Sequence, residues 1–138
     1  RGYSGQCRIS FRIKALQMNY TIRYNGNFNR LVTLLEERDP SHDAEWYREN
    51  YRVYGSMQNS VIPIGTKLKT NAYKINKYNT KKKKWVLVHD DVIAFKGWNT
   101  EPDGTGHYLK NKAAFEPTWL DRMIYGETYT LYAQWEIK

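Results

Sequence analysis

Hydrophobic and polar residues alternate along several short stretches of this chain. In one of them Tyr20, Ile22 and Tyr24 are separated by the polar residues Thr21 and Arg23. A period of two residues is typical of a β-strand with one buried face. The alternation predicts strands over residues 9–14, 20–24, 61–64, 72–78, 85–88, 92–98 and 128–135.

Helical spacing replaces this alternation after the second predicted strand. Leu31, Leu34 and Leu35 would lie on one face of a helix. Asn27 or Asn29 could cap its first turn, because an asparagine side chain accepts hydrogen bonds from free backbone N–H groups. The dipeptide before it, Asn25-Gly26 (residues 25–26), predicts a tight turn with a positive φ.

A second helix is expected after Pro40, with Ser41 as its N-cap and Gly55 as its end. One face of this helix would carry Tyr47, Tyr51 and Tyr54 at i, i+4 and i+7. Residues 36–49 hold six acidic residues and two arginines, so the region is acidic. A third, short helix is predicted over 113–123, with Pro117 near its start. Strands and helices together predict an α+β fold.

Composition supports a single domain over residues 1–138. The chain is 15% aromatic and 41% hydrophobic, with a mean hydropathy of −0.81. This length can bury a core without disulfide or metal support, and Cys7 is the only cysteine, so an internal disulfide is excluded. No apolar run is long enough to span a membrane. We expect no cofactor and no metal.

The positive charge is concentrated in one segment. The net charge is +8, and six lysines lie between positions 74 and 84 with no acid among them. The sequence "NTKKKK" separates two predicted strands, which indicates a long hairpin with a lysine-rich tip. The candidate binding residues are Lys74, Lys77, Lys81, Lys82, Lys83, Lys84, Tyr73, Tyr78 and Trp85.

This hairpin has two interpretations. The lysines could simply keep an exposed sheet edge soluble. Alternatively, lysines interleaved with aromatic residues could bind single-stranded nucleic acid or an anionic glycan, because charge follows the backbone while rings stack. The first interpretation is the commoner one for an exposed charged segment.

Catalytic chemistry has little support in the sequence. His89, Asp90 and Asp91 are consecutive, so their side chains would alternate in direction and could not all bind one ion. The "DGTG" of residues 103–106 lacks the repeated acids of a calcium loop and predicts a plain turn. No nucleophile, base and oxyanion set converges, and we expect no enzymatic activity.

Four spaced segments carry a family resemblance. They are "YTIRYNGN" (20–27), "MQNSVIPIGTKL" (57–68), "FKGWNTEPDGTGHY" (95–108) and "TLYAQW" (130–135). In this order they resemble the Listeria–Bacteroides repeat, also called the internalin-type B repeat, over about residues 20–135. The resemblance implies a small β-grasp-like mixed sheet, with residues 1–19 as an N-terminal strand extension. This sequence departs from the family pattern by two insertions, a helical one at 28–56 and the lysine-tipped hairpin at 74–92.

The resemblance also places the terminal tryptophan in the core. The residues expected to form the structural core are Ile22, Phe95, Gly97, Trp98, Leu131, Ala133 and Trp135. Trp98 should plug one end of this core, and Gly97 should allow close approach of another chain segment.

Two classes of function remain open. The resemblance implies a non-enzymatic structural or adhesive module of a bacterial cell-surface or secreted protein, acting through protein or glycan contacts. The basic hairpin 74–85 alone suggests a nucleic-acid or other polyanion-binding domain. If the acidic and basic insertions lie near each other they would attract within the domain. If they lie at opposite ends they could join copies head to tail, which would give self-association.

Overall fold

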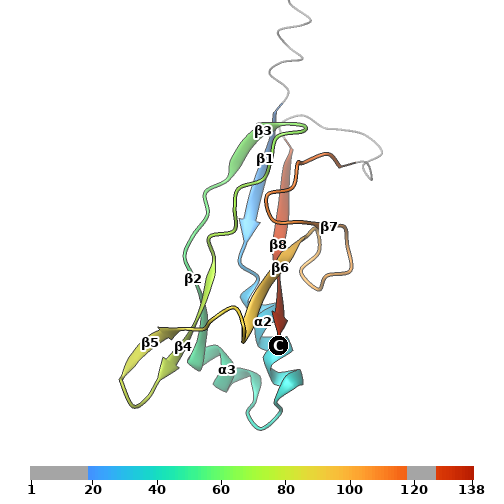
Figure 1. The fold of residues 1–138 in the computed structure, drawn as a ribbon. Coiled ribbons are helices and arrows are strands. Elements are labelled where there is room, and N and C mark those ends of the chain that lie inside the picture. Colours follow the sequence, from blue (N-terminus) through green and yellow to red (C-terminus); the bar gives the residue numbers. More distant parts are fainter. Residues whose placement is uncertain (1–18, 118–126) are drawn as a thin grey trace, which may run out of the picture.

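The computed structural model describes residues 19–117 and 127–138 of the chain (Figure 1). Its helices are α2 (Phe28–Arg38) and α3 (Ala44–Asn50). Its strands are β1 (Asn19–Asn25), β2 (Tyr51–Tyr54), β3 (Ser60–Pro63), β4 (Lys74–Asn79), β5 (Lys84–Leu87), β6 (Ile93–Asn99), β7 (Tyr108–Leu109) and β8 (Thr128–Ile137). The strands form a five-stranded mixed sheet, in the order β3-β1-β8-β6-β7, and a three-stranded sheet, β2-β4-β5.

The predicted α+β class is confirmed by this architecture. The parallel pair β1 and β8 lies in the middle of the large sheet, and every other strand pair is antiparallel. The parallel pairing of β1 with β8 joins the first and last described strands in one sheet. The assignment to the β-grasp group remains a prediction.

The alternating strands bury the faces that the sequence indicated. In β1 Ile22 is fully buried, and in β8 Leu131 and Ala133 are fully buried while Trp135 is 6% exposed. Trp98 is also fully buried, with Tyr24 and Phe95 around it at ring-centroid distances of 5.1 and 5.0 Å. Among the expected core residues with side chains, Phe95 alone is half-buried.

Gly97 is needed where β6 bulges. The pairing of β6 with β8 shifts register between Phe95 and Gly97, and Gly97 has a φ of +143°. A Cβ atom on Gly97 would lie 2.4 Å from Cε1 of Tyr108. The expected close approach therefore comes from the ring of Tyr108, whose hydroxyl donates to the carbonyl oxygen of Lys96 at 2.7 Å.

The turn after β1 differs from the prediction. Neither Asn25 nor Gly26 has a positive φ; the left-handed residue is Asn27, with φ +59°. Gly26 is required for space instead, because a Cβ there would lie 2.7 Å from Cγ1 of Val53. Asn27 is the N-cap residue of α2, one of the two predicted candidates, but its side chain makes no capping hydrogen bond and donates to the carbonyl oxygens of Ala133 and Pro102, both at 2.8 Å.

The first predicted helix is confirmed as α2, but the second is shorter than expected. Its N-cap is Asp43, which accepts from the backbone N–H of Trp46 at 2.9 Å, and not Ser41. The helix ends at Asn50, so Gly55 does not terminate it. Tyr51 and Tyr54 belong to β2, and only Tyr47 of the three tyrosines is on the helix.

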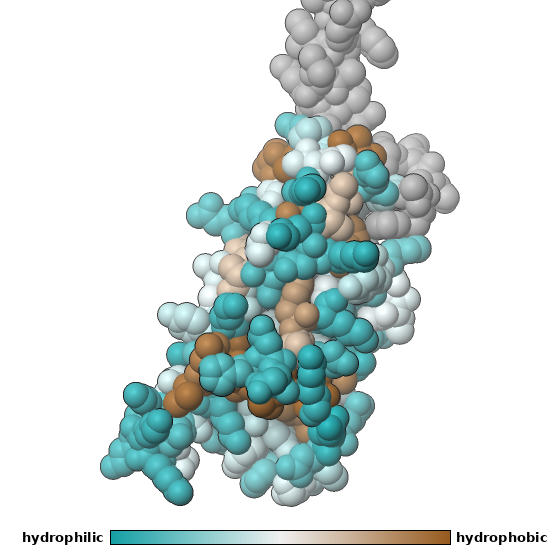
Figure 2. Space-filling view, in the orientation of Figure 1, coloured by the Kyte–Doolittle hydropathy of each residue, from teal (hydrophilic) through white to brown (hydrophobic). Residues whose placement is uncertain are grey.

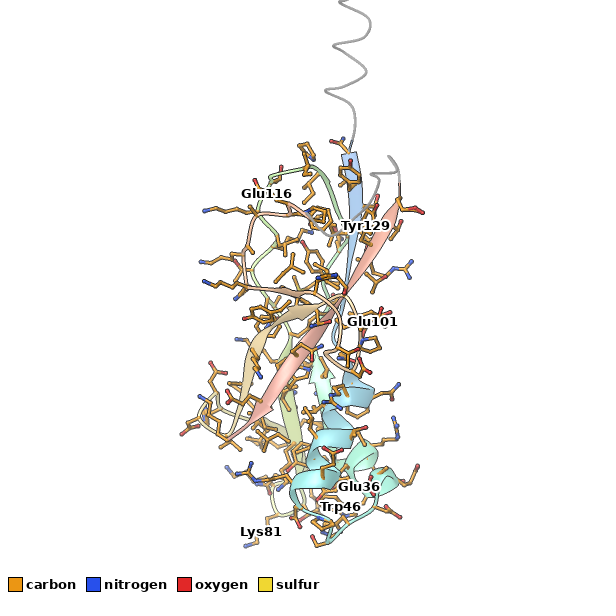
Figure 3. All side chains as sticks on the ribbon, turned by 90° about the vertical axis from the view of Figure 1, so that its right-hand side faces the viewer. Glu36, Trp46, Lys81, Glu101, Glu116 and Tyr129 are labelled. Carbon is orange, nitrogen blue, oxygen red and sulfur yellow. The ribbon has the colours of Figure 1, made fainter. Side chains whose placement is uncertain are left out.

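The two insertions meet in the second sheet. β2 follows the acidic helices and pairs antiparallel with β4 of the lysine hairpin, with Tyr51 opposite Lys77 and Val53 opposite Ile75. Figures 1 and 3 place both helices and the hairpin at the same end of the molecule, and the labelled Glu36, Trp46 and Lys81 lie there together. The arrangement with the insertions at opposite ends was therefore wrong, while self-association by any other contact remains a prediction.

Four other features named from the sequence lie partly or wholly outside the described residues. Residues 113–117 are not helical: Ala114 bridges Lys67, and Phe115 is 1% exposed in the core. Residues 118–123 of that predicted helix lie outside the described residues. So do the predicted strand 9–14, most of the 1–19 extension, and Cys7.

Candidate functional site

The lysine-tipped hairpin is formed as predicted, by β4 and β5. Residues 80–83 make the turn, and the side-chain oxygen of Asn79 accepts from the backbone N–H of Lys82 at 2.9 Å. Lys83 takes a left-handed conformation with φ +56°, which closes the turn without a glycine. Figure 2 shows the tip as a hydrophilic lobe projecting from the body, with hydrophobic surface near its base. The four consecutive lysines 81–84, here called the lysine tip, are all exposed.

Strand register divides the candidate residues between two faces of the small sheet. Residues directly opposite each other in an antiparallel pair share a face. Tyr78 is opposite Trp85, and Asn76 is opposite both Arg52 and Leu87. One face therefore carries what we call the outer cluster: Arg52, Tyr54, Tyr78 and Trp85. The other face carries Tyr51, Val53, Ile75 and Lys77.

The outer cluster is a continuous row of cation–π and ring contacts. The guanidinium carbon of Arg52 lies 4.4 Å from the ring centroid of Trp85 and 5.1 Å from that of Tyr54. Tyr78 packs edge-on against Trp85, with centroids 5.5 Å apart and planes at 74°. Tyr54 is 56% exposed and the other three side chains are half-buried. The row thus holds a fixed positive charge among aromatic rings that solvent can reach.

The opposite face borders an open hollow of about 580 Å³ between the hairpin and the turn before β6. The ammonium group of Lys77 lies 5.4 Å from the ring centroid of Tyr51. Lys81, His89 and Val92 also line the hollow. Cationic groups therefore lie on both faces of the hairpin and at its tip.

Sequence reasoning was partly wrong about this surface. Tyr73 is buried in the core, where its hydroxyl donates to the carbonyl oxygen of Tyr24 at 2.8 Å. Lys74 shares the face of the outer cluster, whereas Lys77 lies on the other face. Arg52 and Tyr54 were missed, because helical spacing of the tyrosines concealed a strand; the β-branched and aromatic run "YRVY" was the available signal.

The side chains with shifted pKa values include Tyr73 in the core, Tyr47 on α3 and Asp103 in the 101–106 loop. Burial raises the pKa of Tyr73. Burial, followed by the nearby Asp39 carboxylate, raises the pKa of Tyr47. Hydrogen bonds from Thr105 lower the pKa of Asp103, whose side chain closes the 101–106 loop as the plain turn that the sequence predicted. Each of these pKa shifts therefore comes from burial, a neighbouring charge or local hydrogen bonds.

The turn before β6 carries His89, Asp90 and Asp91. Residues 89–92 form a turn, in which the carbonyl oxygen of His89 accepts from the N–H groups of Val92 and Ile93 at 2.9 and 3.1 Å. Within residues 19–117 and 127–138, no three His, Cys, Asp or Glu side chains are grouped as metal ligands. Neither helix of the described chain is long and apolar enough to cross a membrane.

Comparison with protein-family models, curated proteins and solved structures finds no match to this chain. The resemblance to the Listeria–Bacteroides repeat therefore remains a prediction from the quoted segments.

Proposed function

We propose that this chain is a non-enzymatic adhesive module of a bacterial cell-surface or secreted protein, and that it binds acidic glycans with the small β2-β4-β5 sheet. The observation that supports this most is the outer cluster, in which Arg52 lies between the rings of Trp85 and Tyr54. The lysine tip extends the same sheet with four further charges. The family resemblance supplies the cell-surface setting.

Acidic glycans match both properties of this surface. Their carboxylate or sulfate groups pair with lysine and arginine, and the C–H faces of their sugar rings can pack on tyrosine and tryptophan. Exposed ion pairs are each worth about 0.3–0.5 kcal/mol, so the lysines must act together. Such binding weakens as salt screens the charges.

Single-stranded nucleic acid is the second candidate, because it too combines phosphates with rings that stack. The geometry favours the glycan. Arg52 already covers one face of the Trp85 ring, and Tyr78 meets that ring edge-on. A series of bases stacks best on open ring faces, whereas a sugar polymer needs less ring area and more charge.

The test measures binding of a heparin-derived oligosaccharide at low and physiological salt. One variant replaces Lys81, Lys82, Lys83 and Lys84 by Ser. The matched control removes the same charge from exposed lysines elsewhere, by replacing Lys67, Lys96, Lys110 and Lys138 by Ser. Four exposed pairs at these energies predict a loss of about tenfold in affinity for the tip variant, and a smaller loss for the control. The melting temperature should barely change.

Two results would contradict the proposal. Equal losses in the tip variant and the control would mean that only total charge matters. Tighter binding of an oligonucleotide with the same number of negative charges would favour the nucleic-acid function instead. An Arg52→Lys variant tests the outer cluster, since lysine keeps the charge but lacks the planar group that stacks on Trp85.

A further inference from the structure

A separate cavity of about 320 Å³ opens where the two sheets meet. Its floor comes from the start of β4, from β6 and from β8, and includes Ile75, Phe95 and Trp135. Its rim comes from the segment before β4, the turn before β6 and the loop after β7, and includes Asn71, Lys74, Asp90 and Asn111. The volume is at the lower end of the range for small-molecule sites, which is about 300–1,000 Å³.

The floor is rigid and aromatic. The indole N–H of Trp135 donates to the carbonyl oxygen of Gly26 at 2.9 Å, which fixes that ring. Phe95 packs edge-on against Trp135 and Trp98, with centroids 5.7 and 5.0 Å apart. A ligand would therefore meet a preformed apolar surface, and little conformational entropy would be lost on binding.

The rim is polar and partly preorganised. The side-chain oxygen of Asn111 accepts from the backbone N–H of Asn71 at 2.9 Å. The Asn71 side chain in turn accepts from the N–H of Tyr73 at 3.0 Å and donates to its carbonyl oxygen at 3.3 Å. Among the residues that the structure describes, no hydrogen bond uses the amide NH₂ group of Asn111, which can therefore donate to a ligand. Lys74 adds a donor and Asp90 adds an acceptor, and both are exposed.

We propose that this cavity binds a single neutral pyranose ring. An aromatic floor suits the apolar C–H face of a sugar, and amide, ammonium and carboxylate groups at the rim suit its hydroxyl groups. Lys74 and Asp90 carry opposite charges. The carboxylate of an acidic sugar would be attracted by Lys74 and repelled by Asp90, so its charge would add little to the affinity. A purely apolar ligand would cover the polar rim without replacing its hydrogen bonds to water. The inference does not depend on the lysine tip, which does not line this cavity.

The experiment follows NMR shifts of the full chain during titration with methyl β-glucoside, methyl β-glucuronide and cyclohexanol as the neutral, acidic and apolar probes. The neutral glycoside should shift the indole N–H signal of Trp135 and the side-chain amide of Asn111, with a Kd of about 1 mM, as for a weak single-site ligand. The Asn111→Ala variant should weaken binding by about fivefold, the loss of one hydrogen bond, and Asp90→Asn by about as much, because its neutral amide oxygen accepts a weaker hydrogen bond than a carboxylate does. Asp91→Asn is the matched control, because this neighbouring acid does not line the cavity, and it should bind as the parent does.

Several results would overturn the proposal. Shifts that avoid Trp135 and Asn111 would place the sugar elsewhere. Equal or tighter binding of cyclohexanol would make the cavity an apolar pocket, and tighter binding of the glucuronide would make it an anion site. An effect of Asp91→Asn as large as that of Asp90→Asn would mean that charge near the turn, rather than contact in the cavity, controls binding. The tip variant should retain this binding even if its affinity for acidic glycans is lost.

Discussion

Replacing Asn27 by Ala should destabilise the fold more than any other exchange of one asparagine for alanine near the helices. Asn27 is 6% exposed, and its amide donates at 2.8 Å to the carbonyl oxygens of Ala133 and Pro102. These bonds join the start of α2 to β8 and to the 101–106 loop. Losing two hydrogen bonds of about 1 kcal/mol each costs about 2 kcal/mol.

Backbone conformation adds a second cost. Asn27 has φ +59° and ψ +50°, a left-handed conformation that costs alanine about 1 kcal/mol. Asn27→Ala should therefore lower the free energy of unfolding by about 3 kcal/mol. Asn27→Gly removes the same hydrogen bonds without the strain but adds about 0.5–1 kcal/mol of chain entropy, so it should cost about 2.5–3 kcal/mol.

Urea unfolding followed by tryptophan fluorescence measures these differences. Asn59→Ala is the control, because Asn59 is exposed in the loop before β3, and it should change stability by less than about 0.5 kcal/mol. If Asn27→Ala costs no more than this control, the two hydrogen bonds do not stabilise the fold. If Asn27→Gly costs clearly more than Asn27→Ala, the left-handed conformation carries no strain for alanine, because only the extra chain entropy of glycine would then separate the two variants.

Three further outcomes are expected. Deleting the last six residues should abolish the cooperative thermal transition seen by circular dichroism, because burial of Trp135 is worth about 3–5 kcal/mol, and a truncated chain with an unchanged melt would contradict this. Gly97→Ala should cost about 1–3 kcal/mol in urea unfolding, since its Cβ would lie 2.4 Å from the Tyr108 ring; a neutral effect would mean that the ring moves away freely. Thr105→Val should raise the lowered pKa of Asp103 in an NMR titration. Because that folded-state pKa lies below the unfolded value, its contribution to stability is present above about pH 4 and is lost as pH falls through the folded pKa.

Local pattern predicted the elements of this fold better than their pairing. Alternation found β1, the hairpin β4–β5, β6 and β8, and it is clearest in β1 and β8, where buried and less buried residues alternate. It could not show that β2 pairs with β4, since these strands are separated by about twenty residues of loop and edge strand. That pairing is non-local and has no signature in either segment alone.

Arg52 and Tyr54 were missed for the same physical reason, the non-local pairing of β2 with β4. Tyr47, Tyr51 and Tyr54 have helical spacing, yet the helix ends at Asn50 and the chain continues as a strand. Tertiary pairing with β4 decides the conformation of residues 51–54, and this places Arg52 over Trp85. Asn27 was expected to cap a helix, and its actual partners are 75 and 106 residues away along the chain. Contacts at such separations cannot be inferred from sequence spacing.

The most direct test of the central claim is a map of amide and indole NMR shifts during titration with a heparin-derived oligosaccharide. If the small sheet is the glycan-binding surface, the largest shifts should come from the Trp85 indole, the Arg52 side chain and the backbone of residues 79–84, all fitting one Kd. An uncharged oligosaccharide of the same length should leave these signals in place. Shifts centred on the acidic helices or the 101–106 loop, or shifts that saturate equally in the variant with Ser at 81–84, would contradict the account.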